Sequence, residues 1–236
     1  MADSIPTGIK GLDRILGGGL KPSSSCLITG APGTGKSVLC LQYIIEGARQ
    51  YNEPGIYITV EEHASDMRDY ANSLGMDFSD LEENGLVTLL EQPILKGSVL
   101  SAEFISKMVE EKGIKRMVLD SLTLFKYMHQ DNPMSLRSNL LKFMVRMREL
   151  NVTLLVTSER NTTSVDNVEY THTDYLFNGI IFLFKPRLKS AFERCLTISK
   201  MRGVDHSLKI HPFAIKTGGI ILQPDATSFA LGGDDQ

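Results

Sequence analysis

The sequence predicts an α/β fold in which a mostly parallel, twisted sheet is flanked by helices and extended by C-terminal antiparallel strands. A glycine-rich phosphate-binding motif stands between a strand pattern and a helix pattern, and strand and helix patterns then alternate as far as residue 184. Beyond residue 184, strand patterns follow one another with no helix pattern between them. The 236 residues fit one large domain, expected at 1–223, with a polar, glycine-rich, disordered tail at 224–236.

Each element follows from the hydrophobic pattern of its segment. Short apolar or β-branched runs predict strands that are buried on both faces. Such runs lie at 26–29, 56–60, 86–90, 117–119, 152–157 and 180–184. Apolar residues spaced three and four apart predict helices from 38 to Gly47 and over 64–74, 99–111 and 135–150. The C-terminal strands are expected at 192–200, 207–215 and 219–222.

Residues 30–37 carry the strongest functional signal. They read Gly30-Ala31-Pro32-Gly33-Thr34-Gly35-Lys36-Ser37 and match G-x-x-x-x-G-K-[ST] at every fixed position. Glycines let several backbone N–H groups approach phosphate oxygens, and the amino end of the helix that follows, from Val38 on, adds partial positive charge. Lys36 is expected to reach the β- and γ-phosphates and the Ser37 hydroxyl to bind Mg²⁺. The motif therefore predicts a site for a nucleoside triphosphate with Mg²⁺.

Carboxylates follow two of the predicted strands. Asp120 ends an apolar strand, and beside a phosphate loop this placement favours Mg²⁺ binding, directly or through water. The alternative is an aspartate that caps the next helix. Glu61 and Glu62 end the strand that begins at 56, and one of them is a candidate general base for an attacking water. Two solvated loop glutamates are the alternative.

Polar groups at two further strand ends complete the candidate site. Ser158 ends the strand at 152–157 and is a candidate sensor of the γ-phosphate, with a polar loop start as the alternative. Lys200 and Arg202 alternate on one strand, so their side chains are expected to point the same way. Two such cations, followed by a glycine turn and His206, suit a clamp on phosphate oxygens. A solvated basic edge strand is the alternative.

Together, these residues form a constellation that resembles the KaiC-like branch of the RecA superfamily of ATPases, in its single-domain form. The resemblance covers about residues 4–222. It rests on four segments: Ile5-Pro6-Thr7-Gly8-Ile9-Lys10-Gly11-Leu12-Asp13 with Gly17-Gly18-Gly19-Leu20; the phosphate loop; Thr59-Val60-Glu61-Glu62; and Ile198-Ser199-Lys200-Met201-Arg202-Gly203 with His206.

The resemblance implies a RecA-like core, assembly into a ring that is commonly hexameric, and hydrolysis of ATP to ADP between neighbouring subunits. One subunit would supply the phosphate loop, Glu61, Glu62 and Asp120, and its neighbour would supply Lys200, Arg202 and His206. A signalling or regulatory role with a further protein partner is the leading expectation. Some members of the family phosphorylate a Ser-Thr pair that aligns with Asp174-Tyr175 here, which favours hydrolysis without self-modification at that position. Thr171 and Thr173 are close enough for a shifted alignment to restore it.

Composition limits the alternatives. The net charge of −3 argues against a dedicated nucleic-acid binder. The sequence shows no apolar run of bilayer length and no signal-peptide pattern. Its three widely spaced cysteines are expected to be buried free thiols of a cytoplasmic protein without a zinc site.

The alternatives are a nucleotide-dependent assembly or docking module with little hydrolysis, a RecA-like DNA-binding ATPase with a basic face, and, more weakly, a small-molecule kinase. The basic face would combine Arg187, Lys189, Arg194, Lys200, Arg202 and Lys209.

Overall fold

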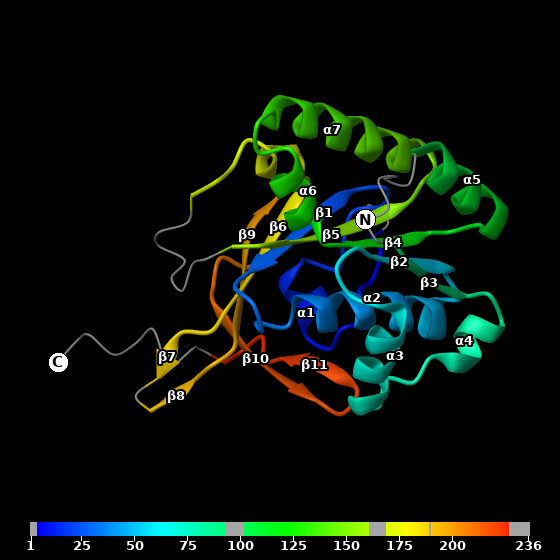
Figure 1. Cartoon of the computed structure of the whole chain (residues 1–236). Coiled ribbons are helices and arrows are strands. Elements are labelled where there is room, and N and C mark those ends of the chain that lie inside the picture. Colours follow the sequence, from blue (N-terminus) through cyan, green and yellow to red (C-terminus); the bar gives the residue numbers. More distant parts are fainter. Residues whose placement is uncertain (1–3, 93–101, 161–168, 189, 227–236) are drawn as a thin grey trace.

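The computed structural model describes residues 4–92, 102–160, 169–188 and 190–226. Its centre is a nine-stranded sheet in the order β11-β10-β9-β6-β1-β5-β4-β2-β3 (Figure 1). These strands are β1 (Ser25–Gly30), β2 (Gly55–Thr59), β3 (Val87–Glu91), β4 (Arg116–Asp120), β5 (Thr153–Glu159), β6 (Gly179–Phe184), β9 (Cys195–Met201), β10 (His211–Lys216) and β11 (Gly219–Leu222). A separate two-stranded sheet pairs β7 (Arg187–Leu188) with β8 (Ala191–Phe192).

The pairing confirms the predicted fold class. Strands β3, β2, β4, β5, β1 and β6 run parallel to their neighbours, whereas β9, β10 and β11 are antiparallel additions at one edge. Parallel strands need crossover connections, which the helices supply. The helices are α1 (Leu12–Ile15), α2 (Lys36–Tyr51), α3 (Ala64–Ser73), α4 (Ser79–Glu83), α5 (Ala102–Lys112), α6 (Leu122–Met128) and α7 (Pro133–Glu149). A single 3₁₀ turn, η2, spans Asp174–Leu176.

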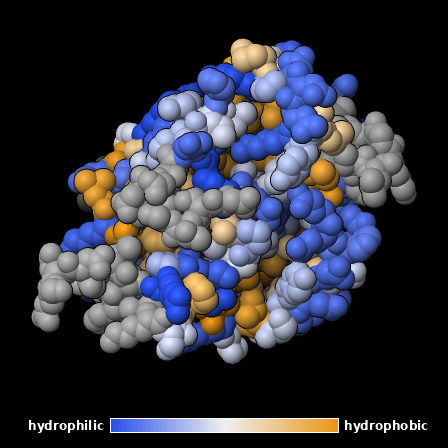
Figure 2. Space-filling view, turned by 60° about the vertical axis from the view of Figure 1, so that its left-hand side comes forward, coloured by the Kyte–Doolittle hydropathy of each residue, from blue (hydrophilic) through white to orange (hydrophobic). Residues whose placement is uncertain are grey.

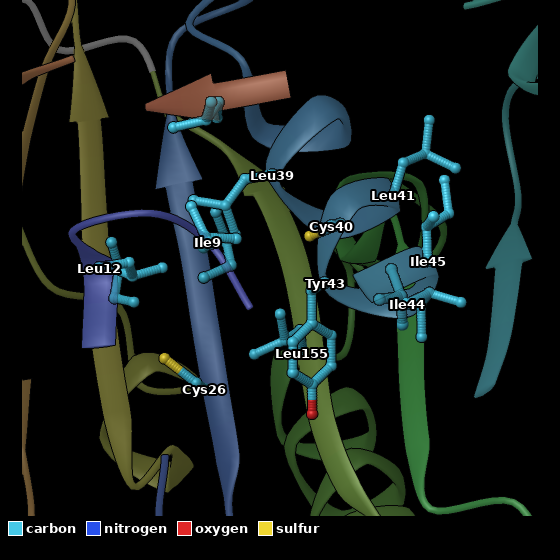
Figure 3. Close-up of a cluster of buried hydrophobic side chains, with 14 of the residues drawn as sticks. Ile9, Leu12, Cys26, Leu39, Cys40, Leu41, Tyr43, Ile44, Ile45 and Leu155 are labelled. Atoms are coloured by element: carbon cyan, nitrogen blue, oxygen red, sulfur yellow. The ribbon is translucent and has the colours of Figure 1, made fainter. Parts of the chain in front are cut away.

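The helices form a layer on each face of the sheet. In Figure 1, α1 to α4 lie below the sheet and α5 to α7 above it. The apolar core is divided accordingly, with one cluster under α2 and a second under α5 and α7. Figure 3 shows α2 directing Cys40, Tyr43 and Ile44 toward the sheet, where Cys26 and Leu155 lie. All three cysteines are buried and lie outside any disulfide, as predicted.

The prediction that α2 ends at Gly47 is wrong. The helix continues to Tyr51, and its carboxyl end is set by Asn52, which adopts a left-handed conformation with φ 52°. Gly47 is instead a contact position, because a β-carbon there would collide with the guanidinium of Arg116. The glycine therefore serves long-range packing, which a local helix-stop rule does not detect.

The boundaries of other elements also differ from expectation. The main C-terminal strands begin later than predicted, at Cys195 and His211. The first residue of the predicted strand 192–200 pairs with β7 instead, and residues 202–210 form the connection between β9 and β10. The short helices α1, α4 and α6 were not expected. Residues 99–101 of the predicted helix 99–111 lie outside the described residues.

The C-terminal boundary is partly described. Pro224 to Ala226 follow β11 as a turn, and Asp225 forms an exposed ion pair with Arg14 at 2.7 Å. The rest of the predicted tail, 227–236, lies outside the described residues. Within the described ranges, every helix falls short of the combination of length and apolarity that crossing a bilayer requires.

Candidate functional site

The phosphate-binding motif forms the connection between β1 and α2. A β-carbon at Gly30 would overlap the carbonyl oxygen of Leu183 on β6. Gly35 precedes α2 with φ 110°, and a β-carbon there would lie 3.1 Å from Cδ1 of Ile215 on β10. Both positions therefore require glycine, because the loop is enclosed between β6 and the β10–β11 hairpin.

Lys36, the first residue of α2, turns back into the loop. Its ammonium group donates hydrogen bonds to the carbonyl oxygens of Gly30 at 3.0 Å and Ala31 at 3.1 Å. Burial lowers the pKa of this lysine, and the nearby carboxylates of Glu159 and Asp120 oppose that shift. The cation is therefore held beside the concave side of the loop by weak carbonyl acceptors, which a phosphate group would replace with stronger ones.

A pocket of about 450 Å³ opens on this loop. Its volume falls in the range typical of small-molecule sites. It is lined by Pro32, Gly33, Gly35, Lys36, Ser37, Val38, Thr59, Glu61, Glu62, Tyr70, Asp120, Ser121, Glu159, Arg194 and Ile215. The structure thus brings most of the predicted cradle together with both glutamates and Asp120. The remaining cradle residues, Gly30, Ala31 and Thr34, build the loop from behind, where the Thr34 hydroxyl donates to the Ala31 carbonyl oxygen at 2.8 Å.

Asp120 is fixed at the base of the pocket by two hydroxyl groups. Tyr57 donates to one of its carboxylate oxygens and Thr157 to the other. Burial, followed by the charge of Asp120, raises the pKa of this phenol well above its usual range, and Ser37 acts on it in the opposite sense. Tyr57 therefore keeps its proton and donates it in the hydrogen bond to Asp120, one of the two predicted Mg²⁺ ligands.

This oxygen-rich set fits Mg²⁺ bound with a phosphate chain. Mg²⁺ is held in such sites by one or two carboxylates, a hydroxyl and phosphate oxygens, with water completing the shell. Ser37 and Asp120 supply that donor set on one side of the pocket. Among the described residues, no group of three or more His, Cys, Asp or Glu side chains is arranged to bind a metal without such a ligand.

The two glutamates have different environments. The Glu61 carboxylate accepts a hydrogen bond from the Ser121 hydroxyl at 2.7 Å. The backbone of Glu62 is held by Thr59, whose hydroxyl accepts from the Glu62 N–H at 3.2 Å and donates to its carbonyl oxygen at 2.8 Å. Burial raises the pKa of Glu62, and the neighbouring anions Asp120, Asp66 and Glu61 add to that shift. A carboxylate with a raised pKa is better suited to accept a proton.

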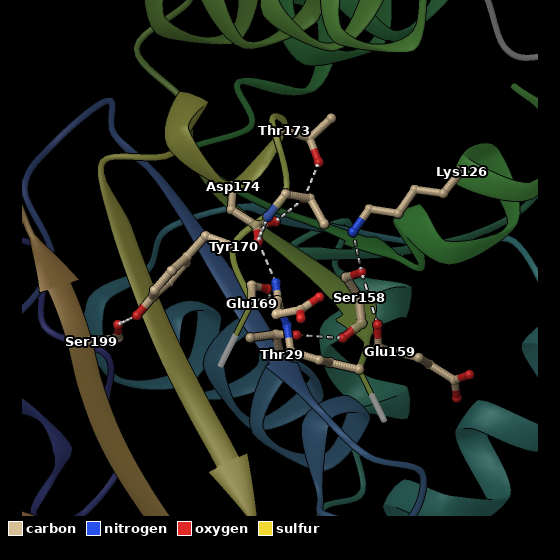
Figure 4. A network of polar contacts seen from close by, with 11 residues as sticks. Thr29, Lys126, Ser158, Glu159, Glu169, Tyr170, Thr173, Asp174 and Ser199 are labelled. Carbon is tan, nitrogen blue, oxygen red and sulfur yellow. Dashed lines mark hydrogen bonds and ion pairs between the residues drawn. The ribbon is translucent and has the colours of Figure 1, made fainter. Parts of the chain in front are cut away.

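Ser158 is not among the residues that line the pocket. Its side chain is 1% exposed, and its hydroxyl accepts a hydrogen bond from Lys126 of α6 at 3.0 Å (Figure 4). The next residue, Glu159, lines the pocket. The predicted phosphate sensor is therefore placed behind the pocket wall.

Lys200 and Arg202 lie at the other end of the sheet from the phosphate loop. Gly179 pairs with Cys26 near the start of β1 and with Met201 at the end of β9, whereas the loop begins at the opposite end of β1. Lys200 donates to the carbonyl oxygens of Phe177 at 2.6 Å and Tyr175 at 3.4 Å, and Arg202 to that of Tyr175 at 3.1 Å. The shared acceptor confirms that the two side chains point the same way.

In the described residues, the predicted cation pair and His206 do not line the pocket of their own chain. His206 instead contacts the Ser207 carbonyl oxygen, at 3.1 Å. Arg194 and the Lys200–Arg202 pair stand at opposite ends of β9, which divides the basic face considered for DNA, and Lys189 lies outside the described residues.

Sequence reasoning missed several residues around the pocket. Tyr57 reads as an ordinary member of a buried strand. Thr157 ends the predicted strand 152–157, which pairs with β1, and this is a usable signal for a polar role, but its contact with Asp120 could not be read from the sequence. Tyr70, Arg194 and Ile215 come from α3 and from either side of β9, and only the three-dimensional arrangement brings them to the loop.

Comparison with known proteins gives a consistent result. The ATPase family model described as KaiC matches residues 5–227. The UPF0273 protein MJ1359 of Methanocaldococcus jannaschii is 32% identical over 239 residues, covering 94% of this chain and 96% of the relative. The circadian clock oscillator protein KaiC of Prochlorococcus marinus is 32% identical over 237 residues, which cover 97% of this chain and 45% of that protein. The chain thus spans about half the length of the clock protein.

A solved structure agrees with these sequence matches. The crystal structure of the KaiC-like protein PH0186 from the hyperthermophilic archaeon Pyrococcus horikoshii superposes with a TM-score of 0.83 at 30% identity, over 95% of this chain and 100% of that one. The family model spans nearly every described residue, and a pocket of the size of a small-molecule site opens at the matching motif. The chain therefore belongs to the KaiC family of ATPases.

Proposed function

We propose that this protein is a Mg²⁺-dependent ATPase that hydrolyses ATP between neighbouring copies of the chain in a ring, and that hydrolysis acts as a regulatory switch. One observation carries the proposal. The phosphate loop, Asp120 and the two glutamates share one pocket, whereas the cations Lys200 and Arg202 lie at the far end of the same sheet. A second copy would bring its own Lys200 and Arg202 to that pocket.

Binding uses the backbone of the loop and Lys36. The loop N–H groups and the amino end of α2 would hold the phosphate oxygens, and Lys36 would exchange the carbonyl oxygens of Gly30 and Ala31 for the β- and γ-phosphates. Ser37 and Asp120 would hold Mg²⁺, which when bound neutralises charge on the β- and γ-oxygens. Tyr57 keeps Asp120 oriented by donating to it.

Hydrolysis requires a water aligned with the γ-phosphorus. The glutamate pair would orient this water and take one of its protons, while the water oxygen bonds to phosphorus and the bond to the β,γ-bridging oxygen breaks, which releases ADP and phosphate. The Ser121 hydroxyl holds the Glu61 carboxylate at the pocket edge. The raised pKa of Glu62 makes it a stronger proton acceptor than an ordinary glutamate.

The neighbouring copy would complete the site with Lys200, Arg202 and His206. Cations that reach a triphosphate from a second subunit stabilise the charge of the transition state, and they make the interface depend on the nucleotide. The match to the KaiC family supports this arrangement and a hexameric ring. A switch read by a further protein partner is the role that fits such an interface.

Turnover measurements on glutamine variants test the proposal. We expect the double variant Glu61→Gln/Glu62→Gln to lose about 100-fold or more in ATP turnover, because general-base catalysis contributes that much. Nucleotide affinity should be retained, since the loop is intact. The matched control Glu111→Gln, on the exposed side of α5, should keep wild-type turnover. Unchanged turnover in the double variant would reject the assignment of the base.

A second candidate function is a nucleotide-dependent docking module in which hydrolysis is incidental. It is favoured by large apolar side chains that α6 and α7 expose to solvent, namely Tyr127, Met128, Met134, Leu141 and Val145. The face shown in Figure 2 is mostly hydrophilic, with small groups of hydrophobic residues between the polar ones. Native mass spectrometry with ATP and with ADP separates the two candidates, because ring formation without turnover supports the docking module.

A further inference from the structure

Asp174 is a buried anion that the proposed chemistry does not use. It begins the η2 turn and is fully buried, and its carboxylate forms an ion pair with Arg160. The same carboxylate accepts hydrogen bonds from the Thr171 backbone N–H at 2.9 Å and the Thr171 hydroxyl at 2.8 Å. A buried carboxylate is costly unless it is paired and hydrogen-bonded in this way, so its position is strongly fixed.

Two further cations face Asp174 from different elements. Its charge partly opposes the burial that lowers the pKa of Lys126 on α6, and it acts in the same sense on Lys200 of β9. Figure 4 shows Asp174 between the end of β5, where Ser158 and Glu159 lie, and the strand that carries Ser199. Asp174 therefore stands between the wall of the nucleotide pocket and the strand of the cation pair.

On one side, the turn that Asp174 begins carries the carbonyl groups that hold the cation pair. The η2 turn is closed by a hydrogen bond from the Phe177 N–H to the Asp174 carbonyl oxygen at 3.3 Å. The carbonyl oxygens of Tyr175 and Phe177, within and directly after this turn, accept the hydrogen bonds of Lys200 and Arg202. A shift of the turn would move both acceptors and with them both cations.

On the other side, Asp174 is linked to the phosphate loop through Arg160. The Arg160 backbone N–H donates to the carbonyl oxygen of Gly30 at 3.2 Å. This is the oxygen that also accepts from the Lys36 ammonium group, at 3.0 Å. If Lys36 turned to bind a phosphate, the Gly30 carbonyl oxygen would lose one of these two donors and keep the Arg160 N–H. The first residue of the loop and the Asp174 turn are thus joined by a single arginine.

We propose that Asp174 is a positioning residue for catalysis in the neighbouring subunit: paired with Arg160, it fixes the turn that holds Lys200 and Arg202 and connects that turn to the phosphate loop of its own chain. This inference rests on the proposed shared site. It assigns Asp174 to the face that a subunit offers its neighbour, and it leaves the subunit's own nucleotide affinity unaffected.

Mixed assemblies test the assignment, with Asp174→Asn as the variant. Two reference variants define the faces: Lys36→Ala removes nucleotide binding but keeps the cation face, and Arg202→Ala does the reverse. If sites are shared, mixing these two inactive variants restores turnover. We expect Asp174→Asn alone to bind ATP within about twofold of wild type and to lose 10-fold or more in turnover. That loss is a part of the 10³- to 10⁵-fold increase in kcat that cations of this kind supply.

The mixing pattern separates positioning from general structural damage. Asp174→Asn subunits should regain turnover with Lys36→Ala partners and gain none with Arg202→Ala partners. The opposite pattern would assign Asp174 to its own pocket, and no rescue by either partner would indicate damage to both faces; each result overturns the inference, as does normal turnover of Asp174→Asn alone. If the two reference variants do not restore each other, the shared site itself is wrong and the inference falls with it.

Two further variants keep the test decisive. If Asp174→Asn does not fold, Arg160→Gln/Asp174→Asn removes both buried charges together, and it should give the same mixing pattern. The matched control is Asp225→Asn, which removes the carboxylate of an exposed pair with Arg14. It should keep wild-type turnover, so a loss there equal to that of Asp174→Asn would contradict the specific role.

Discussion

At the scale of single residues, the pocket concentrates carboxylates around one buried cation. Lys36 lies among Asp120, Glu159 and Glu61, all of which affect its pKa. Such a cluster is unfavourable for an isolated chain, because like charges repel at short range. The residues that would carry the chemistry therefore lower the stability of the fold, as in many sites where activity and stability oppose each other.

Glu62 allows this cost to be measured through its pH dependence. Its folded pKa is raised above the ordinary value of 4.5, so the ionised form is disfavoured in the native state. Replacing it with glutamine should stabilise the fold at neutral pH by only about 1 °C in Tm, because solvent screens this exposed side chain. The gain should shrink as the pH falls through the raised pKa, because native Glu62 then takes up a proton, and it should vanish below 4.5. Thermal unfolding of both proteins across this range checks the prediction, and a gain independent of pH would contradict it.

At the scale of elements, Arg116 joins three parts of the chain at the start of β4. Its side chain is fully buried and donates to the Glu53 carboxylate at 2.6 Å, the Tyr43 carbonyl oxygen at 3.2 Å and the Pro6 carbonyl oxygen at 2.8 Å. The guanidinium also lies 4.7 Å from the centre of the Tyr43 ring. One side chain thus ties the N-terminal segment and α2 to the sheet.

Removal of this arginine should be strongly destabilising. Arg116→Met leaves buried carbonyl groups and Glu53 without their donor, and the loss is expected to be about 3 to 5 kcal/mol, or roughly 6 to 20 °C in Tm. Arg14→Met, which breaks an exposed arginine–aspartate pair, is the matched control and should leave Tm nearly unchanged. Differential scanning calorimetry of the two variants makes the comparison, and equal losses would show that burial of Arg116 is not the cause.

These elements also show how far the sequence could predict the structure. The loop at residues 30–37, Asp120 and the glutamate pair were predictable, because their spacing and the alternation of strands and helices are local signals. Arg116 and Gly47 contact each other across the fold, so neither the buried arginine nor the continuing helix could be read from neighbouring residues. The places of Tyr70, Arg194 and Ile215 in the pocket could not be predicted either, because tertiary packing brings them there.

At the scale of the whole molecule, the length of the sheet separates the pocket from the predicted cation pair. The pocket lies at the carboxyl end of the parallel strands, as expected for an open α/β sheet. The Lys200–Arg202 pair lies at the amino end. Because the length of the sheet lies between them, one copy cannot apply its own Lys200 and Arg202 to its own pocket. Head-to-tail contact between copies closes into a ring when the rotation between them permits it.

This arrangement predicts how stability depends on concentration. Mg·ATP at 100 times its dissociation constant should stabilise the fold by about 2.7 kcal/mol. If the nucleotide also bridges two copies, Tm in Mg·ATP should rise further with protein concentration, because unfolding is then linked to dissociation. Tm without nucleotide is the control and should depend less on concentration. A Tm in Mg·ATP that does not change over a hundredfold range of protein concentration would indicate a site contained within one subunit.

The enclosure of the phosphate loop by the β10–β11 hairpin has a consequence for biosynthesis. Gly35 is translated early, whereas Ile215, which packs against it, leaves the ribosome near the end of the described chain. A nascent chain that already displays the glycine motif therefore still lacks one wall of its pocket. Any stabilisation of this domain by a bound nucleotide would therefore be complete only after the hairpin has emerged, and the early stages of folding would depend on the chain alone.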